Sequence, residues 1–526
     1  MSTNDSRTHK SMMNASISLL FYFINIVVGF LLRRYTLHAL GGEITGMKST
    51  IQNFLGMLSI TELGVGTAIA YALYKPLHNR DITEINEIIS VQGWFYRRIA
   101  LIFALGACTI MAFFPYIFEK ADVPMWMTYA TFIVILFNSM AGYLINYRSS
   151  VLYADQKGYK LTIYTQSVYI GKNLLQSIAL LIIKDLNTAY ATFLILEFLL
   201  SLWGIYILEI VLRREYPWLK PQPGKGKELL HKYQFIITKT KQLFVHQLAG
   251  VVLNNSGSAI IYAFTSLTLV SKYDNYMMLA LSLNNLSHQA LNSINAGIGS
   301  LVAEGDIKRI KSFFWELLSL KYYLATVLCF GLLMFSHPFV TLWVGEEYLL
   351  ENSILLLISL FIFIGITRTT DAFTTAYGLF DDIWAPATEC LLNLILSISL
   401  GYFFGLHGII IGVITSLILI VKIWKPYYLF HRGFQTSAIE YWKRYIKYPL
   451  VSWGILCICF YFLPPLISHF DTFPKLVLAG ILYSILFAIV LFGIYYKMDP
   501  SFKNISLRLY QAVIKRLFSF LYKKGQ

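Results

Sequence analysis

The feature that most constrains the fold is a succession of apolar runs, each about 20 residues long, separated by short polar connections. A run of about 20 apolar residues is the length that a helix needs to cross the hydrocarbon core of a membrane. Strong runs lie near 12–32, 99–118, 125–147, 188–212, 322–340, 353–370, 386–405, 408–424, 449–466 and 476–496. Weaker runs lie near 46–74, 160–183, 243–264 and 276–303. Only 13% of the residues are charged, against about 25% in soluble proteins. The sequence therefore predicts an all-α polytopic membrane protein with about 14 transmembrane helices.

The basic residues predict the orientation of these helices. The first ten residues are polar and no small-residue cleavage site follows the first run, so we expect that run to be a retained span. With the N-terminus inside, the cytoplasmic connections hold about 33 Lys and Arg residues and the outer connections about 7. We therefore expect both termini in the cytoplasm. The net charge of +15 then reflects topology and an anionic inner leaflet, and no nucleic-acid-binding module is recognisable.

The polar stretches predict four parts. Residues 1–213 form an N-terminal six-helix lobe, and 214–241 form a basic cytoplasmic linker broken by prolines and glycines. Residues 242–430 form a second six-helix lobe, and 431–526 a terminal helix hairpin with a basic amphipathic tail. In the tail, Ile505, Leu509, Val513 and Leu517 recur at helical spacing opposite Arg508, Lys515 and Arg516. This pattern is typical of a helix on the inner leaflet, and a solvated basic tail is the alternative.

A repeated phrase relates the two lobes. Residues 64–70 read GVGTAIA and residues 297–303 read GIGSLVA, each in the second span of its lobe. Because six spans return the chain to the same side, the lobes are predicted to be parallel repeats about an axis along the membrane normal. The small residues indicate close helix approach. They do not indicate a phosphate loop, which would join a strand to a helix and carry a Lys before the Ser or Thr.

Polar stripes in the weak spans point to a hydrated cavity. Polar side chains in a bilayer are costly and usually face a bundle interior, although each Asn or Gln could instead bond neighbouring helices. Guanidinium groups in such a cavity suit phosphate, which they hold in a bidentate manner. For Arg33 and Arg34 the alternative is snorkelling to the outer interface. The predicted substrate-binding residues are Arg33, Arg34, Lys48, Gln52, Lys172, Asn254, Asn255, Lys272, Asn284, His288 and Asn292.

Carboxylates within the spans are candidates for ion coupling. We expect this role first for Glu62 and then for Asp371, with Arg368 beside it, although Glu62 could be structural and Arg368 and Asp371 could pair with one another. We predict no catalytic residue, metal site or cofactor. The five cysteines lie in or beside apolar runs, and no Walker pattern or large soluble domain is present.

The segments LLRRYTLHALGGEITG (31–46), ELGVGTAIAYALYKPL (62–77) and LYADQKGYK (152–160) resemble the polysaccharide-transporter branch, the Wzx-type flippases, of the multidrug/oligosaccharidyl-lipid/polysaccharide exporter (MOP) superfamily. The resemblance implies two repeats around a V-shaped cavity of alternating access. It implies transport of a polyprenyl-diphosphate-linked oligosaccharide, such as an O-antigen, capsule or exopolysaccharide unit, across the bacterial cytoplasmic (inner) membrane. It assigns the diphosphate to Arg33, Arg34, Lys172 and Lys272. The implied partners are this glycan lipid, membrane lipids, and polysaccharide polymerase and assembly enzymes.

Three other functions remain open. An ion-coupled multidrug antiporter of the same superfamily fits twelve spans, and a flippase of peptidoglycan lipid precursor fits fourteen spans and a cationic cavity. A membrane polysaccharide polymerase or ligase would carry catalytic Arg or His residues on a long outer loop. The longest outer connection, near 337–352, has neither Arg nor a His cluster.

Overall fold

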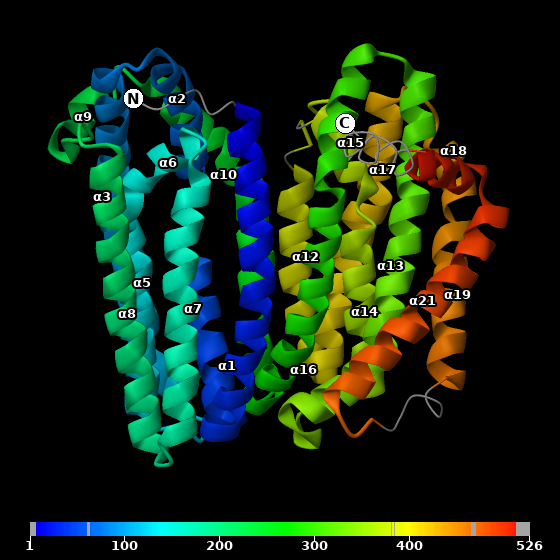
Figure 1. Ribbon diagram of the computed structural model, residues 1–526, viewed down its shortest axis with the longest axis horizontal. Helices are drawn as coiled ribbons and strands as arrows, with labels where there is room; N and C mark the ends of the chain where they lie inside the picture. The colour runs from blue at the N-terminus through cyan, green and yellow to red at the C-terminus, as the bar shows by residue number, and fades with distance from the viewer. Residues whose placement is uncertain (1–6, 60–63, 380, 383, 464–469, 512–526) are drawn as a thin grey trace, which may run out of the picture. The chain divides into compact units, whose positions relative to one another are not determined.

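The computed structural model describes residues 7–59, 64–379, 381–382, 384–463 and 470–511. These residues are almost wholly helical and contain no strand (Figure 1). Nine helices among them are long and apolar enough to cross a membrane. Two of the nine are long enough to cross twice, and α7, α10 with α11, and α12 occupy the more polar predicted spans. The predicted all-α, multi-pass fold with about 14 membrane helices is confirmed.

The two longest helical stretches are each broken by a glycine. Helix α1 (Arg7–Leu58) breaks at Gly41, with φ of 79°, and α16 (Trp384–Leu417) breaks at Gly405, with φ of 54°. Glycine enters this left-handed region without the steric cost that a Cβ atom brings. Beyond Gly405 the chain folds back on itself, so that Asn393 Nδ2 donates to Ser416 Oγ at 3.4 Å. Each break therefore separates two spans.

The chain divides into two compact units, Met1–Ser271 and Lys272–Gln526. Unit 1 contains α1 and the following helices: α2 (Val65–Asn79), α3 (Ile82–Ala112), α4 (Phe114–Ile117), α5 (Met125–Leu144), η2 (Asn146–Ser149), α6 (Ser150–Ala154), α7 (Gly158–Ile182), α8 (Leu186–Glu215), η3 (Pro223–Lys225), α9 (Gly226–Leu229), α10 (Gln234–Asn255) and α11 (Gly257–Phe264). Helix α7 packs between α1 and α8, and α5 packs on α3 and α8. Helices α2, α6 and α9 lie at one end of the unit, and the α7–α8 turn lies at the other (Figure 1). The lobe boundaries expected from the linker stay a prediction.

Unit 2 is built around one long helix. It contains most of α12 (Leu267–Glu304), then α13 (Ile307–Val344), η4 (Glu346–Tyr348), α14 (Asn352–Ile366), α15 (Thr369–Ala376), α16, η5 (Ile418–Trp424), α17 (Lys425–Tyr428), η6 (Leu429–Gly433), α18 (Ala438–Tyr445), α19 (Lys447–Phe462) and α21 (Phe473–Met498). Helix α13 packs on α14, α19 and α21, and the rings of Phe330 and Phe487 stack at 4.0 Å. The other side of α21 exposes Leu478, Leu482 and Ile489, as expected of a helix whose outer face meets lipid.

The predicted linker is attached to unit 1. Asn86 Oδ1 accepts from the backbone amide of Lys220 at 2.6 Å, and Ser90 Oγ accepts from that of Gln222 at 2.7 Å. Glu87 forms an ion pair with Lys232 at 2.5 Å. These contacts lie in the second and third turns of α3, so the linker is held against the N-terminal part of that helix.

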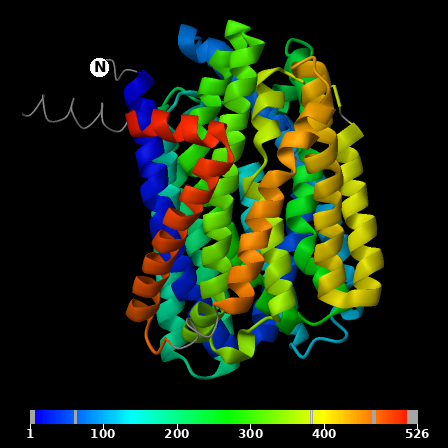
Figure 2. The same cartoon turned by 90° about the vertical axis from the view of Figure 1, so that its right-hand side faces the viewer.

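A helix over residues 500–511 follows α21 and runs across the end of unit 2 (Figure 2). Phe502 and Ile505 are buried, and Arg508 forms an ion pair with the buried Glu316 at 2.9 Å. Leu509 and Tyr510 are exposed. The first turns of the tail thus pack on protein, whereas the predicted positions beyond 511 lie outside the described residues.

Asp499 joins this helix to the terminal hairpin. Its buried carboxylate accepts from Tyr448 Oη at 2.5 Å and from Arg444 Nη2 at 3.0 Å, with Lys447 Nζ at 3.3 Å. Burial by itself raises the pKa of Asp499, but the Tyr448 hydrogen bond and the two cations outweigh it and hold the pKa below its ordinary value. The carboxylate is therefore needed in its ionised form.

We expect Asp499→Asn to lower the free energy of unfolding at neutral pH by about 2 kcal/mol, because it removes hydrogen bonds to an ionised group. This stabilisation is complete above the unfolded-state pKa of about 3.9 and is lost as the pH falls through the lower folded-state pKa. Thermal unfolding in detergent at neutral pH and at several values below about 4 measures the difference. Asp471→Asn, at an 84% exposed side chain, is the control. An equal pH dependence in both variants would contradict this account.

Candidate functional site

Glu197 organises a polar cluster inside unit 1. Its Oε1 atom lies 2.5 Å from Lys172 Nζ, and its Oε2 atom accepts from Gln176 Nε2 at 2.9 Å. The Gln176 amide also donates to the Phe193 carbonyl at 3.1 Å. These contacts join α7 to α8. They satisfy the carboxylate from both sides, which a buried charge requires.

Two further cations complete this group, which we call the unit 1 cluster (Arg33, Lys48, Lys172 and Glu197). Lys48 Nζ lies 4.4 Å from the centre of the Phe193 ring, and the charges of Glu197, Lys172 and Arg33 all act on it. Arg33 Nη2 donates to the backbone oxygen of Ser271 at 2.9 Å and to its hydroxyl at 3.2 Å. Lys48 and Lys172 thus lie near the Glu197 carboxylate, and Arg33 lies within electrostatic reach of Lys48.

The unit 1 cluster lies deep in the helices. Lys172 lies roughly 20 Å of helix rise from the first residue of α7 and roughly 15 Å from its last. Ionisable side chains at such depth are costly and usually mark a functional path. Glu197 was not among the predicted site residues, although a single acid within the apolar run LILEFLL could have indicated it. The surplus of positive charge suits an anionic ligand.

Unit 2 holds a second cluster where α14 ends. The helix stops at Ile366, and its last carbonyl groups need partners from elsewhere. Lys422 lies in the π-helix η5. It donates to the Thr367 backbone oxygen at 2.9 Å and to the Thr367 hydroxyl at 2.6 Å. Lys321 of α13 donates to the Arg368 backbone oxygen at 3.3 Å. Both lysines are buried.

Asp371 is the ion-paired carboxylate of this second group, the unit 2 cluster (Lys321, Arg368, Asp371, Glu389, Lys422 and Lys425). It lies 2.6 Å from Arg368 Nε and 2.9 Å from Lys425 Nζ. The sequence spacing allowed the Arg368–Asp371 pair as an alternative, and the structure contains it. Because two cations already hold Asp371, its carboxylate is bound tightly in place. Four cations and two acids make this cluster positive as well.

Glu389 is the other acid of the unit 2 cluster. It is buried on α16 and lies within electrostatic reach of Arg368, Lys425 and Asp371. Among the described residues, none forms a hydrogen bond or ion pair with its carboxylate. Glu389 was not among the predicted site residues, because it stands at the start of the strongly apolar run TECLLNLIL.

The other predicted residues lie around the two clusters or elsewhere. Arg34 and Lys272 are half-buried, and Gln52 is exposed. Asn255 Nδ2 donates to the Val251 carbonyl at 2.8 Å in its own helix. The exposed His288 lies within electrostatic reach of the unit 2 cluster.

Asn284 packs against α14, with its side-chain oxygen buried and without a partner among the described residues. Glu62 lies outside the described residues, as do the side chains of Asn254 and Asn292. The roles expected for all these residues stay predictions. Within the described ranges, no group of three or more His, Cys, Asp or Glu side chains could hold a metal ion.

Comparisons with known proteins bear on the fold. No family model matches the chain, and no curated protein matches its sequence. A solved structure of the lipid II flippase MurJ in an inward closed conformation matches 92% of this chain and 99% of its own length, at 16% identity and a TM-score of 0.58. An inward-facing multidrug resistance MATE family transporter of the MOP superfamily matches 79% of this chain and 98% of its own length, at 13% identity and a TM-score of 0.53. The chain has the fold of these transporters. At these identities the similarity shows a shared fold, and the Wzx-type branch is not shown.

We expect Glu197→Gln to destabilise unit 1 by about 3–5 kcal/mol, because it leaves largely buried cations without their carboxylate. Lys172→Met should also destabilise, and the double variant should lose less than the sum of the two single losses. Unfolding of the four proteins in detergent measures this coupling. The exposed pair Arg309–Glu304 is the control and should contribute about 1 kcal/mol or less. Additive losses at Lys172 and Glu197 would show that the two do not interact.

Proposed function

We propose that this protein is a flippase that moves a polyprenyl-diphosphate-linked oligosaccharide across the bacterial cytoplasmic membrane by alternating access. The observation that carries the proposal is the surplus of half-buried and buried cations in each unit of a transporter fold. The near full-length structural match to a lipid II flippase supports it. The glycan lipid, membrane lipids and the enzymes that polymerise or assemble the polysaccharide are its proposed partners.

The charge of the diphosphate in the cargo sets the physical requirement. An ionised diphosphate cannot enter hydrocarbon without losing several kcal/mol or more of solvation. Cations held in the protein interior can replace that solvation while the lipid tail stays in the bilayer. Lys172 is already neutralised by Glu197. Arg33, Lys48 and the neighbouring Arg34 are therefore the first candidates to receive the diphosphate in unit 1.

A peptidoglycan lipid precursor flippase is the second candidate, because the matched MurJ structure is described as a lipid II flippase. Its cargo is also a lipid-linked saccharide, so the same cations would serve it. The multidrug antiporter is less favoured, since the matched MATE structure leaves about a fifth of this chain uncovered. We propose an O-antigen, capsule or exopolysaccharide unit on the basis of the sequence resemblance.

Energy coupling is assigned to carboxylates. Glu62 keeps the role that the sequence suggests. In unit 2 we now place Glu389 ahead of Asp371, because Asp371 is occupied by Arg368 and Lys425 whereas no described residue bonds the Glu389 carboxylate. A buried carboxylate without a bonded partner can take up a proton or a small cation during the cycle.

Leaflet exchange in proteoliposomes containing a labelled polyprenyl-diphosphate oligosaccharide tests the proposed function. We expect Arg33→Ala/Arg34→Ala to slow exchange about tenfold or more, because each lost hydrogen bond to an ionised group costs about 1.5–3 kcal/mol. The matched control is Arg97→Ala/Arg98→Ala, an adjacent and exposed arginine pair near the middle of α3. It should retain the wild-type rate.

If folded wild-type protein exchanges no lipid-linked saccharide with or without a proton or sodium gradient, the flippase proposal is wrong. Gradient-driven efflux of a cationic dye by the same protein would then favour the antiporter. If both arginine double variants slow exchange equally, the proposal that the unit 1 cluster binds the diphosphate is wrong.

We expect Glu389→Gln to abolish acceleration of exchange by a proton or sodium gradient while leaving exchange without a gradient unchanged. The amide keeps the shape of the side chain and removes its ability to bind a proton or cation. The comparison uses proteoliposomes with and without an imposed gradient. Glu351→Gln, at a 74% exposed side chain, is the control. A Glu389→Gln variant that still responds to the gradient would return the role to Glu62 or Asp371.

A further inference from the structure

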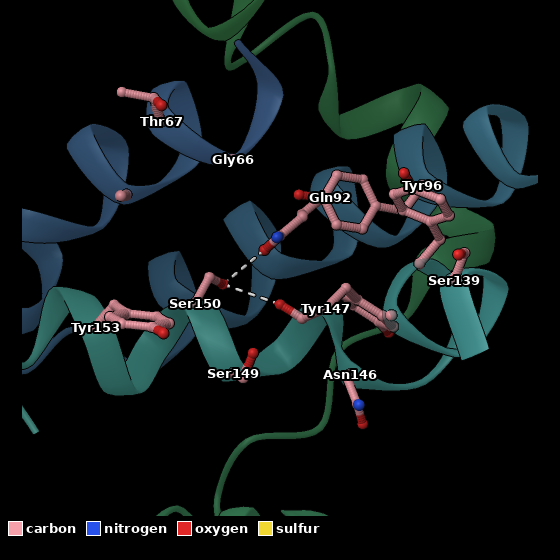
Figure 3. A pocket seen from close by; sticks show the side chains of 13 residues that line it. Gly66, Thr67, Gln92, Tyr96, Ser139, Asn146, Tyr147, Ser149, Ser150 and Tyr153 are labelled. Carbon is pink, nitrogen blue, oxygen red and sulfur yellow. Dashed lines mark hydrogen bonds between the residues drawn. The ribbon is translucent and has the colours of Figure 1, made fainter. Parts of the chain in front are cut away.

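Unit 1 contains a cavity of about 650 Å³ that the proposed mechanism has not used. It lies between α2, α3, α5, η2 and α6, as Figure 3 shows. Its volume falls within the range of roughly 300–1,000 Å³ that is usual for small-molecule sites. We call it the tyrosine cavity, because Tyr96, Tyr143, Tyr147 and Tyr153 line it.

Small side chains of α2 border the cavity. Gly66, Thr67 and Ala70 line it, whereas Val65, Ile69 and Leu73 on the adjacent face of α2 are buried. The repeated phrase GVGTAIA was expected to allow close helix approach. That expectation stays a prediction, and in this unit three residues of the phrase, Gly66, Thr67 and Ala70, also border the cavity. The end of α5 then turns through η2 into α6, which carries the chain around the cavity.

The aromatic wall is held rigidly. The rings of Tyr96 and Tyr143 meet edge to face at 5.8 Å, and those of Tyr96 and Tyr147 at 6.5 Å. The attached linker supports this wall from behind, because a Cβ atom at Gly93 would lie 2.8 Å from Pro223 and 3.0 Å from the Tyr147 ring. Tyr153 is 61% exposed. Three tyrosines are thus fixed, and the fourth is accessible.

The polar groups that the described residues offer to the cavity are neutral. Among the described residues that line it, none carries a charge. Ser150 Oγ donates to Gln92 Oε1 at 2.8 Å and also approaches the Tyr147 carbonyl at 3.0 Å (Figure 3). Within the described part of the chain, the Asn146 amide and the Ser149 hydroxyl have no protein partner. The cavity therefore offers both donors and acceptors to a ligand.

We propose that the tyrosine cavity binds uncharged sugar residues of the transported glycan. The inference rests on the proposed function and extends it. Tyrosine rings offer flat apolar faces with a polar tip, which match the apolar C–H face and the hydroxyl rim of a pyranose ring. A phosphate would need cations and a drug cation would need a carboxylate, and the described lining residues supply neither. A neutral polyhydroxylated ligand fits the chemistry best.

The topology predicted from the sequence makes this position useful. The connections 75–98 and 147–160, which adjoin the cavity, are expected in the cytoplasm. A lipid-linked glycan in the inner leaflet would present its sugars at that end. The protein would thus bind the two chemical parts of the cargo in different places, the sugars in the tyrosine cavity and the diphosphate on the cations.

Binding of free saccharides tests the inference without the lipid. The full chain in nanodiscs is titrated with a panel of neutral hexose and N-acetylhexosamine di- to tetrasaccharides, followed by calorimetry. We expect at least one to bind. Ala70→Leu, which fills the cavity, and Tyr153→Ala, which removes the accessible ring, should weaken binding about tenfold or more. Tyr116→Ala removes another exposed tyrosine of unit 1, 77% exposed, and should bind like the wild type. Equal binding by all variants would place the sugar site elsewhere.

If no panel member binds, leaflet exchange decides. Ala70→Leu should slow exchange of the glycosylated lipid diphosphate and leave exchange of the sugar-free polyprenyl diphosphate unchanged. Equal rates for both lipids in wild type and variant would overturn the inference. If saccharides bind but no lipid is exchanged, the sugar site in the cavity is supported and the flippase function is refuted. If lipid is exchanged but Ala70→Leu has no effect, the flippase function is supported and the sugar site in the cavity is refuted.

Discussion

A helix that ends inside a membrane leaves carbonyl groups that no water can satisfy, and this constraint organises much of unit 2. Helix α14 stops at Ile366, and the carbonyl groups of Thr367 and Arg368 accept from the ammonium groups of Lys422 and Lys321. Because the caps are lysines, satisfying the backbone also brings positive charge into the interior. A structural requirement therefore creates the electrostatic character of the unit 2 cluster.

The two clusters share a design although different elements build them. In each, a carboxylate is held by hydrogen-bonded or ion-paired groups, and the cations outnumber the acids. Buried ion pairs are weak contributors to stability relative to apolar side chains. Their presence at the depth of Lys172 is better explained by function than by stability. A protein that must replace the solvation of an anionic cargo needs positive charge that is already held in place.

The similarity to a lipid II flippase and to a MATE transporter, at 16% and 13% identity, establishes a shared fold. Fold alone does not establish cargo. The local chemistry therefore carries the distinction between cargoes. Positive interior clusters disfavour cationic drugs, and the tyrosine cavity at the end of unit 1 is the proposed place for sugars. The two observations are independent and point to the same class of molecule.

The sequence by itself determined the membrane spans, since the free energy of transferring a run of about 20 residues depends on that run alone. It also offered the Arg368–Asp371 pair as one alternative, because the two residues are only three apart in the chain. Only the tertiary structure decided that Lys172 meets Glu197, that Lys422 caps α14, and that Gly66 borders a cavity. These contacts join different helices, and their register depends on packing along the whole length of each helix. No periodicity within a single helix encodes that register.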